Sequence, residues 1–127
     1  MIRYRRAPDL EEKVRDIVVR ASLTHIHPDR VRCVRSYGSK SGFTTARIHT
    51  ASKALLTGLG LKPVYVIEFI SERFDSLSGE EQEAVIIHEL LHIPKSFGGG
   101  LIGHRRIDFE EEAKVIMDIV RRMRSQG

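Results

Sequence analysis

The segment HELLH, residues 88–92, constrains the fold of this 127-residue chain more than any other feature. It lies in a stretch whose apolar residues would cover nearly the whole circumference of a helix, which predicts a buried helix. Ser78 and Glu81 form an S-x-x-E capping box that marks its start, and Pro94 predicts an end at Ile93. The fold must therefore bury two histidines and a glutamate, and these polar groups need partners.

The spacing of the two histidines suits a metal ion. His88 and His92 are four residues apart, so on a helix both imidazoles leave the same face about 6 Å apart along the axis. Two ring nitrogens can then bind one tetrahedral zinc ion. Glu89 projects about 100° around the helix from His88, where its carboxylate can take a proton from a water that the metal activates. The pattern predicts one zinc ion, with Glu89 as the general base.

A catalytic zinc site usually needs a third protein ligand and leaves the fourth position open. His104 follows glycines 98–100, which let the chain reverse toward the helix. Glu112 is the rival, because a carboxylate on the apolar stripe of the last predicted helix needs a cation or another partner. We favour His104, because imidazole needs no charge compensation. Glu112 would then orient a ligand histidine or pair with Arg105 or Arg106.

The remaining patterns predict an α+β domain rather than an alternating parallel sheet. Asp9 and Glu12 resemble a capping box at the start of the first helix. A turn-like segment between the first two strands makes a hairpin plausible, and residues 52–59 fit either a short helix or a strand. The predicted helices span residues 9–23, 78–93 and 108 onward, and the predicted strands span 31–36, 44–50 and 64–70. We expect a short, mostly antiparallel sheet packed on an N-terminal helix, the central helix that carries HELLH and a C-terminal helix.

The composition indicates one soluble globular domain over residues 1–127. Hydrophobic residues make up 41% of the chain and charged residues 30%. No apolar run has transmembrane length, and no apolar stretch follows the basic N-terminus, so we expect a cytoplasmic protein. Cys33 is the single cysteine, which excludes an internal disulfide and a cysteine-based zinc site, and we expect it in the core.

The chain carries a net charge of +4, and its arginines gather near residues 3–6, 30–35 and 121–124. Such an excess can attract nucleic acid or other polyanions. A solvated surface is the more ordinary interpretation. We therefore expect weak, sequence-independent nucleic-acid binding at most.

Other polar residues are weaker candidates for the site. His25 and His27 form a His-x-His pair, which we expect in a surface turn rather than at a metal. His49 lies on a predicted strand and is expected to be packed or exposed, although it could donate to a transition state. Tyr37 and Tyr65 are possible oxyanion donors, and the sequence does not rank them.

The stretch HELLHIP, continued by FGGGLIGH, resembles the zincin metallopeptidases. More narrowly, it resembles small metallopeptidases of archaea and phages, which are in turn similar to SprT-like metallopeptidases. The similarity is strongest between Tyr65 and His104. It implies a zincin-like domain in which His88, His92 and His104 bind zinc and Glu89 acts as the base.

Two details of that family transfer less directly. SprT-like members often carry an aromatic residue four positions after the third histidine, whereas Phe109 here lies five after His104. In many zincins the strand before the metal helix lines the cleft. By that analogy, a strand over residues 64–70 could pair with an extended substrate peptide.

The sequence thus predicts a zinc-dependent metallopeptidase of the HExxH type that acts on peptide or protein substrates. One alternative is a metal-dependent nuclease or other hydrolase on a basic scaffold. Some bacterial ribosomal-RNA maturation proteins have three histidines at broadly similar spacing, but they lack a glutamate directly after the first. Another alternative is a zinc-binding module for nucleic acid or protein, without catalysis. A fourth protein ligand on the metal would favour that module.

Overall fold

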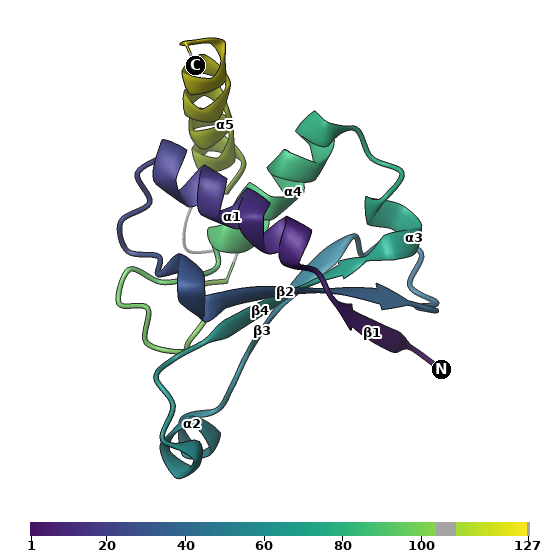
Figure 1. Ribbon diagram of the computed structural model, residues 1–127, viewed down its shortest axis with the longest axis vertical. Helices are drawn as coiled ribbons and strands as arrows, with labels where there is room; N and C mark the ends of the chain where they lie inside the picture. The colour runs from purple at the N-terminus through teal and green to yellow at the C-terminus, as the bar shows by residue number, and fades with distance from the viewer. Residues whose placement is uncertain (104–108, 127) are drawn as a thin grey trace.

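A computed structural model describes residues 1–103 and 109–126 of the chain. Strands and helices are interspersed over the first part of the chain, and three helices of the described part follow the last strand (Figure 1). The strands are β1 (Arg3–Arg6), β2 (Val31–Tyr37), β3 (Ala46–Thr50) and β4 (Tyr65–Ile70). The helices are α1 (Pro8–Arg20), the 3-10 turn η1 (Pro28–Arg30), α2 (Lys53–Leu59), α3 (Ser71–Phe74), α4 (Gly79–Leu90) and α5 (Phe109–Gln126).

The four strands form one sheet in the order β1-β2-β4-β3. The β2–β4 pair is parallel, and the β1–β2 and β3–β4 pairs are antiparallel. Helices α1 and α4 lie on one side of the sheet, α5 packs against both of them, and α2 projects away from the body between β3 and β4 (Figure 1). This arrangement confirms the predicted α+β domain with a small, mostly antiparallel sheet.

The core lies between the sheet and the helices. Alternate residues of β4, namely Tyr65, Ile67 and Phe69, are fully buried there, as the two-residue period of a strand requires. They share this core with the buried stripe of α1, which includes Val14 and Ile17. Among the described residues, no helix combines the length and apolarity needed to cross a membrane.

The predicted hairpin between residues 31–36 and 44–50 is wrong, because β4 lies between β2 and β3. The residues of β4 are mostly apolar on both faces, and such a strand is most stable at the centre of a sheet. The segment 38–45 therefore crosses the end of β4 instead of making a tight turn. Its Thr45 carbonyl accepts a hydrogen bond from the Ile70 amide at 2.9 Å.

Several element boundaries differ from their predictions. The capping box expected at Asp9 and Glu12 is wrong, since α1 begins after Ala7 with no side-chain cap. Instead, Asp9 binds Arg35 of β2. The capping box of Ser78 and Glu81 is confirmed, but α4 ends at Leu90, three residues before the predicted end. Strand β1 was not predicted, because its four residues are all exposed and give no apolar alternation.

Candidate metal centre

The end of helix α4 carries the HELLH motif, and this helix contacts the edge strand β3. His88 and Glu89 lie in its last turns, and His92 lies in the turn that follows, where its amide donates to the Glu89 carbonyl at 3.1 Å. The imidazole rings of His88 and His92 are 5.5 Å apart between centroids, with an interplanar angle of 70°. Two imidazoles at this separation can share one ion, as the i, i+4 spacing predicts.

His92 is oriented by a second segment of the chain. Its Nδ1 lies 2.7 Å from the carbonyl oxygen of Ile102, and the Ile102 amide donates to the His92 carbonyl at 2.8 Å. Because a carbonyl oxygen only accepts, Nδ1 carries the proton of this hydrogen bond, and a neutral ring in this tautomer has its lone pair on Nε2. A metal-ligating histidine usually makes this kind of hydrogen bond through its other nitrogen.

Glu89 is buried, with 8% of its surface exposed. Burial raises the pKa of its carboxyl to about 7, because an apolar environment disfavours the charged form. A carboxylate with a pKa in this range accepts protons more readily than an exposed one and can give them up again near neutral pH. The environment of Glu89 therefore suits a general base.

The motif opens onto a cleft of about 460 Å³ between α4 and the start of β3. The residues that line this cleft are apolar, except for three residues of the motif and two threonines. The lining residues are Phe43, Thr44, Thr45, Ala46, Ala84, Val85, His88, Glu89 and His92. The Phe43 side chain is 92% exposed, so an aromatic ring stands at the mouth of this cleft.

The strand beside this cleft is β3, which corrects the expectation that residues 64–70 pair with a substrate. Strand β4 is hydrogen-bonded to β2 on one side and to β3 on the other, so it has no free edge. Strand β3 is the last strand in the sheet order, and it pairs only with β4. An extended peptide in the cleft would therefore meet β3.

Tyr65 holds the glycine turn that follows α4. Its hydroxyl accepts a hydrogen bond from the Gly99 amide and donates one to the Gly100 carbonyl, both at 2.9 Å. The Thr50 hydroxyl donates to the Gly99 carbonyl. Gly99 has a φ of +100°, a conformation that residues with a side chain rarely adopt. The turn is thus fixed to β3 and β4, and the Tyr65 hydroxyl is engaged there rather than placed as an oxyanion donor.

Sequence reasoning named Tyr65 but missed this role. The available signal was a lone hydroxyl in a strand that is otherwise nearly all apolar. A buried tyrosine hydroxyl needs a hydrogen-bond partner, and the glycines downstream are the backbone that it finds.

The two candidates for the third metal ligand are His104 and Glu112. His104 lies outside the described residues. Glu112 is exposed on α5 and lines a separate hollow with Glu111, Val115 and Ile116. Within residues 1–103 and 109–126, no group of three or more His, Cys, Asp or Glu side chains could hold a metal ion. Glu112 therefore does not complete a ligand set with His88 and His92 in this structure.

The other histidines lie apart from the cleft. His27 packs edge-on against Phe97, with ring centroids 4.9 Å apart. His25 is half-buried, and desolvation lowers its pKa. His49 is exposed on the sheet face opposite the helices, where its Nε2 lies 2.8 Å from the buried Glu68 carboxylate. Cys33 is buried in the core, as expected, and burial raises the pKa of its thiol to about 12.

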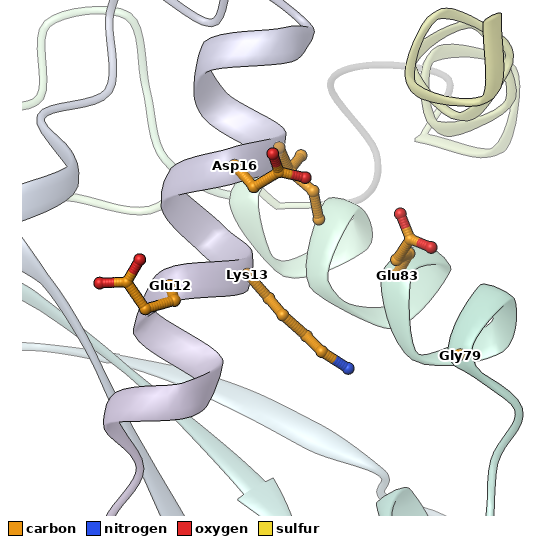
Figure 2. Close-up of a pocket in the computed structure, with 6 residues that line it drawn as sticks. Glu12, Lys13, Asp16, Gly79 and Glu83 are labelled. Atoms are coloured by element: carbon orange, nitrogen blue, oxygen red, sulfur yellow. The ribbon is translucent and has the colours of Figure 1, made fainter. Parts of the chain in front are cut away.

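A second hollow, of about 420 Å³, lies between α1 and α4 (Figure 2). Glu12, Lys13 and Asp16 of α1 line it together with Gly79 and Glu83 of α4, and the Lys13 side chain extends toward α4. The Lys13 ammonium donates to the Gln82 side chain at 3.1 Å. No histidine lines this hollow, in contrast to the cleft at the HELLH motif.

The donor set around His88 and His92 fits zinc. Two imidazoles, one of them oriented through Nδ1, are typical zinc ligands, and an adjacent buried carboxyl is the usual base of such sites. Among the described residues, two histidines, His88 and His92, line the cleft.

Comparison with known families identifies a match over nearly the whole chain. The family model described as "Putative phage metallopeptidase" matches residues 2–125. No curated protein and no solved structure matches the chain. The matched range covers nearly the whole chain, and the family is one of enzymes that use a metal and act on peptides or proteins. The resemblance to small phage metallopeptidases is therefore confirmed, and the chain belongs to this phage metallopeptidase family.

Proposed function

We propose that the chain is a zinc-dependent peptidase in which His88, His92 and His104 hold one zinc ion and Glu89 is the general base. The observation that carries this proposal is the pair of hydrogen bonds between His92 and Ile102. In the neutral tautomer these bonds leave the lone pair of the ring on Nε2, the atom that we propose to bind zinc, and they hold Ile102, two residues before His104, beside His92.

The reach of the backbone supports His104 as the third ligand. It follows Ile102 by two residues, and two residues span at most about 7 Å. Ile102 is itself bonded to His92 through both its amide and its carbonyl. Glu112 lacks a comparable link to the motif among the described contacts, and it is exposed.

Glu89 carries the proton transfers in the proposed reaction. Zinc, when bound, supplies Lewis-acid activation of water and of the substrate carbonyl. Glu89 takes the proton that the attacking water loses, and then delivers it to the nitrogen of the departing amine. Its raised pKa lets one group perform both steps near neutral pH, since neither protonation state is strongly disfavoured.

The substrate in this proposal is an extended segment of protein or peptide. It adds to the free edge of β3, where its backbone groups find hydrogen-bond partners, and it crosses the apolar cleft over α4. Since the cleft is open and its lining is mostly apolar, an unfolded protein such as casein is a suitable first substrate.

The test is the Glu89→Gln variant, which keeps the shape of the side chain and leaves all three proposed ligands in place. It should fold and bind zinc like the parent. Its rate of casein cleavage should be lower by at least about 10²–10⁴-fold, the usual contribution of a positioned base. Glu110→Gln, an exposed change on α5, is the matched control and should keep the parent rate.

Chelation should abolish the parent activity, and added zinc should restore it. Equal cleavage by Glu89→Gln and the parent would exclude Glu89 as the base. Cleavage of nucleic acid but not of casein by the parent would support the nuclease alternative. Zinc binding without any hydrolysis would support an interaction module.

A further inference from the structure

Strand β1 collects positive charge that forms no ion pair with the acidic groups of the described residues. Its sequence, RYRR, places three arginines in four residues, and all four residues are exposed. Within the part of the chain that the structure describes, Arg3, Arg5 and Arg6 form no ion pair. Arginines that do pair with an aspartate or a glutamate include Arg20, Arg32, Arg35, Arg47 and Arg121.

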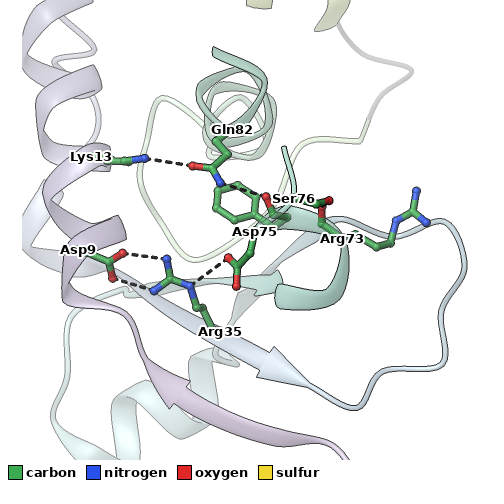
Figure 3. A network of polar contacts seen from close by, with 8 residues as sticks. Asp9, Lys13, Arg35, Arg73, Asp75, Ser76 and Gln82 are labelled. Carbon is green, nitrogen blue, oxygen red and sulfur yellow. Dashed lines mark hydrogen bonds and ion pairs between the residues drawn. The ribbon is translucent and has the colours of Figure 1, made fainter. Parts of the chain in front are cut away.

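Two of the acidic residues near this strand, Asp9 and Asp75, are bound to Arg35. Arg35 is the register partner of Arg5, and its guanidinium donates two hydrogen bonds of 2.8 Å to Asp9 and one of 3.4 Å to Asp75 (Figure 3). Both carboxylates are therefore directed to Arg35 rather than to β1. The positive potential of β1 is left for an external anion.

Two tyrosines accompany these arginines. Tyr4 lies within β1 and is 60% exposed. Tyr37 pairs with Arg3 in the register, and the Arg5 guanidinium carbon lies 6.0 Å from the centre of its ring. Arg3, Tyr4, Arg5 and Tyr37 line a shallow hollow of about 360 Å³. Cations that follow a backbone, together with aromatic rings on which bases can stack, are the features of single-strand binding surfaces.

The geometry of a strand favours nucleic acid over a membrane. Alternation places Arg3 and Arg5 on one face of β1 and Tyr4 and Arg6 on the other, so neither face is apolar. Binding in a lipid interface needs an apolar face that can be buried. Charges on an edge strand also prevent edge-to-edge pairing of sheets, but that role does not need an exposed tyrosine between the arginines.

We propose that β1 and Tyr37 form a binding surface for single-stranded nucleic acid, with arginine contacts to phosphates and tyrosine stacking on bases. The surface lies on the edge strand opposite β3, so three strand spacings, about 14 Å, separate it from the strand that borders the cleft. Bound nucleic acid would leave the cleft open. This proposal does not depend on the peptidase activity. It assigns to β1 the weak nucleic-acid binding that the excess of basic residues led us to expect.

The test measures binding of the full chain to a fluorescently labelled thymidine oligonucleotide of about 16 nucleotides by anisotropy. For the parent, a fourfold increase in salt should weaken binding by about 20-fold, as expected for three phosphate contacts on a single strand. The triple variant Arg3→Ala, Arg5→Ala, Arg6→Ala should lose at least about 10-fold in affinity at 0.1 M salt. The slope of log K against log salt should become smaller by about 2.

A second triple variant removes the same charge elsewhere. Arg20→Ala, Arg32→Ala, Arg121→Ala changes arginines that are already paired, so its affinity should fall less than about 3-fold at 0.1 M salt, where distant charges are screened. Tyr4→Ala should lower affinity by about 5–150-fold, the effect of losing one stacked base, with an unchanged salt slope. This combination separates stacking from charge.

Three results would overturn the proposal: equal losses in the two triple variants, no binding by the parent at low salt, or equal competition by polyglutamate at matched charge. Binding to phosphatidylserine vesicles that depends on Arg3, Arg5 and Arg6, without oligonucleotide binding, would assign the surface to membranes. Because β1 side chains are exposed, the variants should fold, and circular dichroism checks this.

Discussion

The Tyr65 hydroxyl connects the centre of the sheet to the turn that precedes His104. It is fully buried, and both of its hydrogen bonds go to backbone groups of Gly99 and Gly100. Leaving such buried groups without a partner costs about 1–3 kcal/mol each. One hydroxyl can therefore decide the position of a backbone segment that contains no large side chain of its own.

Replacing Tyr65 with phenylalanine should weaken zinc binding without removing any proposed ligand. The ring would still fill the core, but the glycine turn would lose its attachment to β4. We expect zinc affinity to fall by about 10–100-fold, which is typical when a group that orients a ligand is lost. Competition with a chromophoric chelator measures this. Tyr37→Phe is the control, because Tyr37 lies on β2 beside Arg5, and it should leave zinc affinity unchanged. Parent-like zinc affinity in Tyr65→Phe would mean that the turn does not position a ligand.

Within the site, contacts between residues close in sequence could be predicted from the sequence, and contacts between residues far apart in sequence could not. The pairing of His88 with His92 follows from helical spacing alone. The bond between His92 and Ile102 joins residues ten apart, and the bonds of Tyr65 join residues 34 and 35 apart. Periodicity carries no information on which buried hydroxyl or imidazole meets which carbonyl, so these partners required the fold.

At the scale of elements, Arg35 joins helix α1, strand β2 and the end of α3. The Asp9 carboxylate binds it through two oxygens, and Asp75 binds it through one. The hydrogen bond from Arg35 lowers the pKa of Asp9 below its usual value of 3.8 and outweighs the opposite effect of burial. A lowered pKa in the folded state means that the ionised carboxylate stabilises the fold.

Asp9→Asn should therefore destabilise the protein in a pH-dependent way. The contribution of Asp9 is present above about pH 3.8, the unfolded value, and it is lost as the pH falls through the lower folded pKa. Because the Asp9 side chain is exposed, we expect a difference in the free energy of unfolding of only about 0.2–1 kcal/mol near pH 7. Urea unfolding of both proteins from pH 7 to pH 2.5 tests this. The two curves should converge at the acid end, and a constant difference would contradict the assignment.

Element order was harder to predict than element type. Helices α1, α4 and α5 and strands β2, β3 and β4 all lie in regions where the apolar pattern predicted them. The predicted hairpin is wrong because strands that follow one another in sequence need not be neighbours in the sheet, and the apolar character of β4 on both faces places it at the centre. Strand β1 has no apolar face at all, since only its pairing with β2 makes it a strand.

At the scale of the whole molecule, the proposed zinc ion would add a link between the end of α4 and the segment that follows the glycine turn. His88 and His92 come from α4 and the turn after it, and the proposed third ligand follows the glycine turn. A ligand that binds the folded chain and not the unfolded chain stabilises the fold by mass action. Zinc should therefore raise thermal stability as well as enable catalysis.

Thermal unfolding with and without zinc tests this link without any substrate. At a free zinc concentration of about 100 times the dissociation constant, the stabilisation should be about 2.7 kcal/mol. For a domain of this size, that corresponds to a rise in Tm of roughly 8–14 °C, with one zinc bound per chain. His88→Ala, His92→Ala should keep the metal-free Tm near that of the parent and lose the rise. His104→Ala should lose most of it, whereas Glu112→Ala should keep most of it. If Glu112→Ala abolishes the rise and His104→Ala does not, the third ligand is the glutamate, and the chain between Ile102 and α5 has a different role from the one proposed here.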